Sequence, residues 1–503
     1  MVADSQPRHS EQDAPQAAAA AQVQPEAARS VVGGLENQEV GRFSEKEVLA
    51  FNSSREGRTL VWVFFVFALF FMWPYQTMVQ MQSFLVKEFP EKGAEAGATM
   101  LLFTTWPLLI THALLSVTGI IRRLPYVVKI TVPCVVVALL AVILVAVVLS
   151  PSTSPDFLLR SLYAAALIES VGQSLVEPAV FDMAGLMPSA LASQGVQAGN
   201  GACGLVVSCV QMLTRLAANG LAPIGKKELE VLTVGFLAIM GFTGVSMVTL
   251  YFQRVRQSSY YLKYVERQDP HENIESEQVD LSEGCAEQQD ATLFGHCADN
   301  VRNIAKALRY VFPSFMAVFL TYCTSMTLWP VIPGASCVAP RAGEFSPEPD
   351  QDNILQSWWF DLVLLCFNFS DFVGKSLRKS LQWGTQRLSP ATQLLLAGLR
   401  AVVFVPIILA CSAPQSFDPR TARWINLSAV FFLGISNGWL STVCFMRAPR
   451  ALPRGTSNAV AEQASSVLVL GLYLGLSTGC LIADQLGKTV LQEYLGACYQ
   501  PMS

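Results

Sequence analysis

Acidic and amide side chains interrupt one long apolar stretch of the chain, between residues 160 and 186. Glu169, Gln173 and Glu177 follow one another at intervals of four residues, so a helix places them on one face. Ionisable groups inside a lipid bilayer are costly, and as a rule they line a polar pathway or pair with one another. The stripe therefore favours the lining of a solute pathway over its alternative, a ladder of hydrogen bonds between helices.

An acid and a base share one face of a second apolar stretch, residues 353–377. Asp371 and Lys375 stand four residues apart, a spacing at which helical side chains meet. A carboxylate that accepts from hydroxyls and an ammonium that donates to a ring atom form a clamp for a polar solute. An ion pair near the cytoplasmic end of the helix explains the two residues equally well. Asp361 lies near the opposite end of the stretch, where solvation accounts for it.

Eleven apolar stretches are long enough to hold these residues inside a membrane, because a helix that crosses about 30 Å of hydrocarbon needs about 20 residues. Of the 503 residues, 52% are hydrophobic and only 14% are charged, against about 25% charged in a typical soluble chain. This composition excludes an ordinary soluble enzyme, and the net charge of −4 gives no basic excess for binding nucleic acid. The stretches are residues 59–86, 96–121, 130–149, 160–186, 194–214, 231–253, 310–332, 353–377, 389–411, 424–446 and 457–483.

The distribution of Lys and Arg between these stretches predicts the orientation of the chain. Cytoplasmic loops of membrane proteins carry an excess of the two residues. Here the excess alternates from loop to loop, except at the short, uncharged fourth loop. The alternation predicts a cytoplasmic N-terminus and, with eleven spans, an extracellular C-terminus. We expect a multi-pass protein of the plasma membrane.

Two helical bundles of six and five spans, joined by a long loop, make up the expected domain organisation. Residues 1–58 are polar and predict a disordered cytoplasmic tail, and residues 254–306 predict an acidic cytoplasmic loop without ordered structure. The bundles correspond to residues 59–253 and 307–486, and residues 487–503 form a short extracellular tail. Paired bundles of this kind are typical of transporters.

Proline interrupts the first expected span, and glycine allows close helix packing at the last. Pro74, followed by Tyr75 and Gln76, lies within the first span and frees a backbone carbonyl. Such breaks are tolerated in a membrane where they line a cavity. Glycines at positions 471, 475 and 479 repeat every four residues in the last span, which predicts a face for close helix packing.

No motif for nucleotide hydrolysis or metal binding stands beside these features. Gly374-Lys375-Ser376 looks like the end of a phosphate-binding loop, but Phe369 occupies the place of the first glycine and no strand precedes it. The cysteines lack the spacing of a zinc site. We therefore expect no metal, no cofactor and no primary pump.

Five motifs resemble those of the equilibrative nucleoside transporters, in the same order and on the same spans. Residues 436–440, Ser-Asn-Gly-Trp-Leu, are similar to the family's Ser-Asn-Gly-Tyr-Leu, and residues 367–376 are similar to its Phe-Asn-x-x-Asp-x-x-Gly-Arg-Ser. Residues 184–188, 199–204 and 400–406 fit as well. The resemblance covers essentially all eleven stretches. It implies an all-helical fold similar to the major facilitator type, alternating access and no covalent chemistry, hence no enzyme.

The resemblance also implies roles for single residues. Asp371 and Lys375 would contact the ribose or the base of a nucleoside. Tyr75 and Gln76 fall where the family has Trp and Asn after the proline. Gating or structural roles are implied for Pro74, Asn200, Arg400 and Asn437.

The chain departs from the family pattern at two of these positions. Lys375 replaces an arginine, so the planar fork that binds a ligand with two parallel hydrogen bonds is absent. The family's glutamine in the fourth span aligns with Glu177, whereas Gln173 offers the same side chain one turn earlier, and both stay candidates for substrate binding. Burial can bring a carboxyl group into titration near neutral pH. Glu177 is therefore a candidate for coupling uptake to protons, although facilitated transport is the simpler expectation.

The expected function is transport of nucleosides, and of nucleobases as a further substrate class, across a lipid bilayer. A channel or receptor-like membrane protein and a carrier for another small polar solute are the alternatives. A membrane-embedded enzyme would need a constellation such as His with Asp, and the intramembrane His112 has no acidic partner in its own span.

Overall fold

The computed structural model describes residues 43–88, 93–220, 226–266, 293–329, 331–334, 349–412, 419–450, 452–453, 456 and 458–489. Within these ranges every regular element is a helix. Most of the expected N-terminal tail, the centre of the expected acidic loop and most of the expected C-terminal tail lie outside the described residues.

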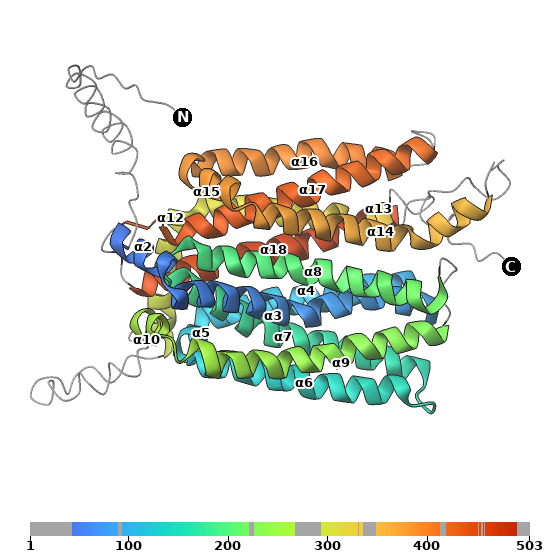
Figure 1. Cartoon of the computed structure of the whole chain (residues 1–503), viewed down its shortest axis with the longest axis horizontal. Helices are drawn as coiled ribbons and strands as arrows, with labels where there is room; N and C mark the ends of the chain where they lie inside the picture. The colour runs from blue at the N-terminus through green and yellow to red at the C-terminus, as the bar shows by residue number, and fades with distance from the viewer. Residues whose placement is uncertain are drawn as a thin grey trace, which may run out of the picture.

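The described ranges contain eleven long helices. They run side by side along the long axis of the molecule (Figure 1). They follow the apolar stretches because a helix in lipid satisfies its backbone hydrogen bonds within itself. Nine of the helices in the described ranges are long and apolar enough to cross a membrane, and the two others, α7 and α14, hold the candidate acids and lysine. The count of eleven spans therefore stays a prediction. The helices are α3 (Arg55–Glu88), α4 (Gly93–Thr118), α6 (Tyr126–Leu149), α7 (Pro155–Leu186), α8 (Ala190–Asn219), α9 (Lys226–Leu250), α12 (Leu293–Leu328), α14 (Pro349–Ser376), α16 (Pro390–Ser412), α17 (Pro419–Arg447) and α18 (Asn458–Thr489).

Helices from the two halves of the chain occupy two sides of the molecule. Figure 1 shows α3 to α9 on one side and α12 to α18 on the other. At the seam, which is the surface where the two halves meet, α8 lies against α14. There Asn368 Nδ2 donates to Ser208 Oγ at 2.8 Å. Large apolar side chains face outward on peripheral helices, for example Val142 on α6 (69% exposed) and Val402 on α16 (72% exposed). An apolar outer surface of this kind suits contact with lipid.

Two segments expected to lack structure contain short helices at one end of the molecule. Helix α2 (Glu45–Ser53) and helix α10 (Ser259–Tyr264) pack against each other, and Tyr264 Oη donates to Glu47 Oε1 at 2.8 Å. This hydrogen bond lowers the pKa of Glu47. Glu56 accepts hydrogen bonds from Ser258 and Ser259. The expectation of disorder for residues 1–58 and 254–306 therefore does not hold in these parts, because each short helix is stabilised by a partner far away in the sequence.

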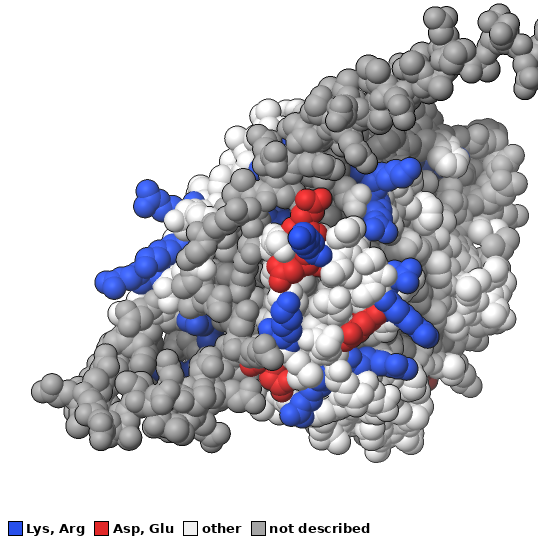
Figure 2. All heavy atoms as spheres, turned by 60° about the vertical axis from the view of Figure 1, so that its left-hand side comes forward, with Lys and Arg blue, Asp and Glu red and all other residues white. Residues whose placement is uncertain are grey.

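Basic side chains gather at the same end of the molecule. Figure 2 views this end and shows Lys and Arg across its surface. The exposed basic residues of the connections and short helices there include Arg123 in α5 (Ile120–Arg123), Arg254 and Arg256 in η1 (Tyr251–Val255) and just after it, Lys263 in α10, and Arg378, Lys379 and Arg387 in α15 (Arg378–Arg387).

Glycines bring the backbones of α8 and α17 against α14. A side chain at Gly438 of α17 would overlap the backbone oxygen of Asp371 and lie 3.1 Å from its Oδ1. On the other side of α14, a Cβ at Gly201 of α8 would lie 3.0 Å from Lys375 Cδ. The expected glycine face of α18 is confirmed as a packing surface, because Gly475 lies against Phe319 and Tyr322 of α12. Helix α14 is thus held on two sides by main-chain contact.

We predict that Gly438→Ala destabilises the protein by about 1–3 kcal/mol, the usual cost of an extra methyl group in a packed site. The measurement is thermal unfolding of the purified protein in detergent. Gly398→Ala is the matched control, because nothing lies within 4 Å of a Cβ at that helical position. Equal unfolding temperatures for the two variants would contradict the close packing at Gly438.

Candidate functional site

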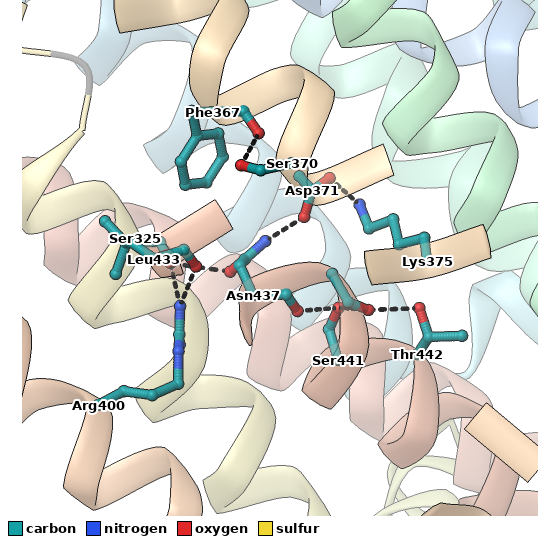
Figure 3. Close-up of polar contacts among 11 residues, drawn as sticks. Ser325, Phe367, Ser370, Asp371, Lys375, Arg400, Leu433, Asn437, Ser441 and Thr442 are labelled. Carbon is teal, nitrogen blue, oxygen red and sulfur yellow. Dashed lines mark hydrogen bonds and ion pairs between the residues drawn. The ribbon is translucent and has the colours of Figure 1, made fainter. Parts of the chain in front are cut away.

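Both carboxylate oxygens of Asp371 are engaged (Figure 3). Lys375 Nζ lies 2.8 Å from Oδ2, and Asn437 Nδ2 on α17 donates to Oδ1 at 2.7 Å. Only 6% of Asp371 and 4% of Lys375 are exposed. The expected pairing of the two residues is present, and it is a buried ion pair that faces neighbouring helices. A buried charge of this kind needs both a counter-charge and hydrogen bonds.

A chain of hydrogen bonds connects Arg400 on α16 to Asp371. Arg400 Nη2 donates to Ser325 Oγ on α12 at 2.9 Å, and Ser325 Oγ donates to Asn437 Oδ1 at 2.8 Å. Arg400 also donates to the backbone oxygens of Thr321 and Leu433. The guanidinium therefore ties α12, α16 and α17 together, which supports the structural role expected for Arg400.

The donor and acceptor roles in this series of hydrogen bonds follow from the chemistry of the Arg400 guanidinium. A guanidinium has only donors, so the Ser325 hydroxyl accepts from Arg400 and turns its own hydrogen toward Asn437. The Asn437 oxygen then faces Ser325, and its amide nitrogen faces Asp371. Asp371 accordingly receives donors from two sides and is held as an acceptor.

A second polar group joins α7 to α18. Glu177 Oε2 accepts from Tyr473 Oη at 2.8 Å and from Gln173 Nε2 at 3.2 Å. Glu177 is 2% exposed and Gln173 is 7% exposed. Gln173 and Glu177, the two candidates for the family's glutamine in the fourth span, thus lie in one hydrogen-bonded group.

The two groups face a common region between the halves of the molecule. The charge of Lys375 acts on Glu177 of α7 as well as on Asp371 of its own helix. Tyr75 on α3 is within electrostatic range of Glu177 and is 8% exposed. Tyr75 also packs with Val79 and Leu101. Glu177 is therefore within electrostatic range of both Tyr75 on α3 and Lys375 on α14.

Two of the candidate residues carry unused acceptors. In the described part of the chain no group donates to Gln76 Oε1 on α3 or to Asn200 Oδ1 on α8. Both residues are 7% exposed. Buried acceptors without a protein donor are typical of positions that a ligand or water completes. Pro74 lies two residues before Gln76, in a helix that continues through it.

Asp361 differs from the sequence expectation. It is 5% exposed, forms an ion pair with Arg215 of α8 and accepts from Gln211 Nε2 at 2.9 Å. Solvation at the end of the span therefore does not account for it. The partner comes from the other half of the chain, and local sequence gives no sign of it.

Sequence reasoning missed Tyr473 and Ser325. Tyr473 lies between Gly471 and Gly475 in the apolar α18, and a tyrosine among glycines was the one available signal. Ser325 lies among other hydroxyl residues of α12 and carries no distinguishing pattern. Elsewhere in the described ranges no three His, Cys, Asp or Glu side chains are grouped as a metal site would need. The arrangement suits recognition of a neutral polar solute by hydrogen bonds.

A family model described as a nucleoside transporter matches residues 162–486 of this chain. Equilibrative nucleotide transporter 8 of Arabidopsis thaliana is 32% identical over 143 residues, which are 27% of this chain and 33% of that protein. Equilibrative nucleotide transporter 1 of the same plant is 22% identical over 320 residues, 64% of this chain and 62% of that protein. Equilibrative nucleoside transporter 3 of Rattus norvegicus is 29% identical over 174 residues, 33% of this chain and 34% of that protein. The matches thus span between one third and about three fifths of these relatives.

A solved structure shares the fold. The proton:xylose symporter XylE of the major facilitator superfamily, bound to 6-bromo-6-deoxy-D-glucose, superposes with a TM-score of 0.50 at 14% identity. The superposition covers 88% of this chain and 92% of the symporter. The expected likeness to the major facilitator fold is confirmed.

We predict that Ser325→Ala and Asn437→Leu are energetically coupled. Ser325→Ala leaves a buried donor of Arg400 and a buried acceptor of Asn437 without a partner, at about 1–3 kcal/mol for each group. In the double variant the Asn437 oxygen is gone, so the total loss falls below the sum of the two single losses. Thermal unfolding of the four proteins measures the coupling.

Ser314→Ala is the matched control on the same helix, because Ser314 Oγ donates to Gln393 Oε1 and not to Asn437. Its loss is expected to add to that of Asn437→Leu. Additive losses for Ser325→Ala and Asn437→Leu would mean that the hydrogen bonds between Arg400 and Asp371 do not act as a unit.

Proposed function

The chain belongs to the nucleoside transporter family, and we propose that it carries nucleosides across a membrane by alternating access. The observation that carries the proposal is the buried Asp371–Lys375 pair, which lies at the seam between the two halves and is fixed as an acceptor beside a donor. A solute held there contacts both halves, so their relative movement changes the side from which the solute is reached.

The hydrogen-bonding capacity left at the pair fits a sugar with hydroxyl groups. A carboxylate has about four lone-pair sites and an ammonium has three hydrogens. The protein uses two sites of Asp371 and one hydrogen of Lys375 in the contacts described. The remaining acceptors suit ribose hydroxyls, and the remaining ammonium hydrogens suit a ring oxygen or a ring nitrogen.

Acceptors also dominate the opposite wall of the proposed site. Glu177 is an acceptor, and the side-chain oxygens of Gln76 and Asn200 have no donor in the described part of the chain. A nucleobase with amino or imino hydrogens supplies them, and the Tyr75 ring offers a surface for the base. Nucleobases without the sugar keep the contacts of this wall and lose those to Asp371, so we propose them as weaker substrates.

We propose that Glu177 also binds a proton during transport. It is buried, it lies between the halves, and its partners Tyr473 and Gln173 are neutral donors. Facilitated transport without proton movement is the alternative. The same carboxyl group then has two roles in the proposal, as an acceptor for the base and as the carrier of the proton.

We propose the plasma membrane as the location and the basic end of the molecule as its cytoplasmic face. The exposed arginines and lysines beside α2, α10 and α15 support this orientation, because such residues are retained on the cytoplasmic side (Figure 2). The same orientation places the N-terminus inside and the C-terminus outside.

We predict that Asp371→Asn lowers nucleoside uptake about tenfold or more, because losing a hydrogen bond to a charged group costs about 1.5–3 kcal/mol. The measurement is initial uptake of labelled nucleoside into proteoliposomes, with the amount of inserted protein determined in parallel. Asp156→Asn is the matched control, since Asp156 is exposed in the first turn of α7. Normal uptake by Asp371→Asn would mean that Asp371 is purely structural.

We predict that an inward proton gradient raises nucleoside uptake by the wild type and that Glu177→Gln removes this response. A carboxamide keeps the shape of the side chain but cannot exchange a proton. Uptake is measured in proteoliposomes with and without an imposed pH difference, using a panel of competing nucleosides and nucleobases. Equal wild-type uptake with and without the proton gradient would exclude proton coupling and leave facilitated transport.

A further inference from the structure

A second buried carboxyl group lies on α7 away from the proposed substrate site. Glu169 is 2% exposed, and no hydrogen bond or ion pair reaches it from the described part of the chain. It borders a partly open cavity of about 20 Å³ lined by residues of α3, α6, α7 and α9. A cavity of this size holds about one water molecule and is too small for a nucleoside.

The wall of this cavity offers no positive charge. Among the described residues that line it there is no Lys, Arg or His, and most are apolar, such as Phe71, Val137 and Met247. An ionised carboxylate in such surroundings is very costly unless a cation accompanies it. These surroundings therefore favour a neutral Glu169 that carries a proton over a carboxylate paired with a bound metal cation.

A proline supplies an acceptor that a neutral carboxylic acid can use. Pro74 has no N–H, so the carbonyl of Phe70, four residues earlier in α3, has no helical donor. Phe70 and Pro74 both line the cavity. A carboxyl group that carries a proton becomes a donor, and a backbone carbonyl without a helical donor is a suitable acceptor for it.

The titratable groups around Glu169 are other acids and neutral donors. Tyr75 on α3, Tyr473 on α18 and Glu177 on the same helix are within electrostatic range, and Cys134 of α6 lines the cavity. From α9 only apolar residues and Thr243 line it. His112 of α4 faces Ser466 and the edge of Tyr473. None of these groups neutralises Glu169.

Gln173 links this cavity to the interface between the halves. It lines the cavity and donates from Nε2 to Glu177 Oε2 at 3.2 Å. Glu169 and Glu177 therefore lie at the two ends of one polar stripe, one inside the N-terminal half and one against α18. A negative charge on both at once is unfavourable, so the charge of one depends on the other.

We propose that the cavity between α3, α6, α7 and α9 is a proton-binding site, in which Glu169 carries the proton and exchanges it with Glu177 along the stripe. The exchange of the proton with Glu177 during transport extends the proton coupling proposed above and rests on that proposal. The presence of the proton itself does not depend on that coupling and is tested separately.

Infrared difference spectroscopy of the purified protein in lipid nanodiscs at pH 7 tests the site. A protonated carboxyl group has a carbonyl stretch that a carboxylate lacks. We expect this band in the wild type, its loss in Glu169→Gln, and its retention in the matched control Glu177→Gln. A band of equal intensity in the wild type and in Glu169→Gln would overturn the proposal.

Three further outcomes are equally decisive. A carboxamide reproduces the shape and the donor of a neutral acid, so Glu169→Gln is expected to unfold within a few degrees of the wild type. A variant that fails to fold would therefore contradict a protonated Glu169. A band that appears only when choline replaces Na⁺ in the buffer would assign the cavity to sodium and overturn the proton. Absent nucleoside uptake with the expected spectra would instead reject the proposed function and leave the site intact.

Discussion

A buried carboxylate that must accept hydrogen bonds on both oxygens organises the C-terminal half of the molecule. Asp371 is satisfied by Lys375 on its own helix and by Asn437 on α17. The orientation of Asn437 depends on Ser325, and that of Ser325 on Arg400. Four helices thus hold their mutual positions through one directed chain, and loss of any member leaves a polar group buried without a partner.

Polar contacts join the two halves near both ends of the molecule and between them. Arg215 and Asp361 join α8 to α14 near the end of the molecule away from α2, and Asn300 of α12 donates to the backbone of Ser116 of α4 near the opposite end. Glu177 and Tyr473 make a contact between them. Apolar packing joins the halves as well, since the Phe181 ring of α7 stacks on the Phe445 ring of α17 with 4.6 Å between the ring centroids. A carrier that opens at one end at a time needs contacts that break as a set at that end and re-form.

The properties that are local in sequence were the ones that could be predicted. Hydropathy located the helices, and the four-residue spacing of Asp371 and Lys375 placed them on one face, because both patterns are complete within a single segment. The partner of Glu177 is 296 residues away and that of Arg215 is 146 residues away. No local pattern tells which helices face each other, so Tyr473 was missed and Asp361 was read as solvated. The order of α2 was missed for the same reason, since it depends on α10.

The contact of Gly438 with Asp371 restricts how the specificity of this protein can change in evolution. The position of Asp371 is set by main-chain packing on α17, so most substitutions around it would move the carboxylate rather than reshape the space beside it. The wall formed by α3 and α7 has no such restriction, because Gln76 and Gln173 are ordinary side chains on helices without glycine contacts at those positions. In the proposed site, divergence toward new solutes would therefore have its least costly route on the N-terminal half, while Asp371 keeps its place on the C-terminal half.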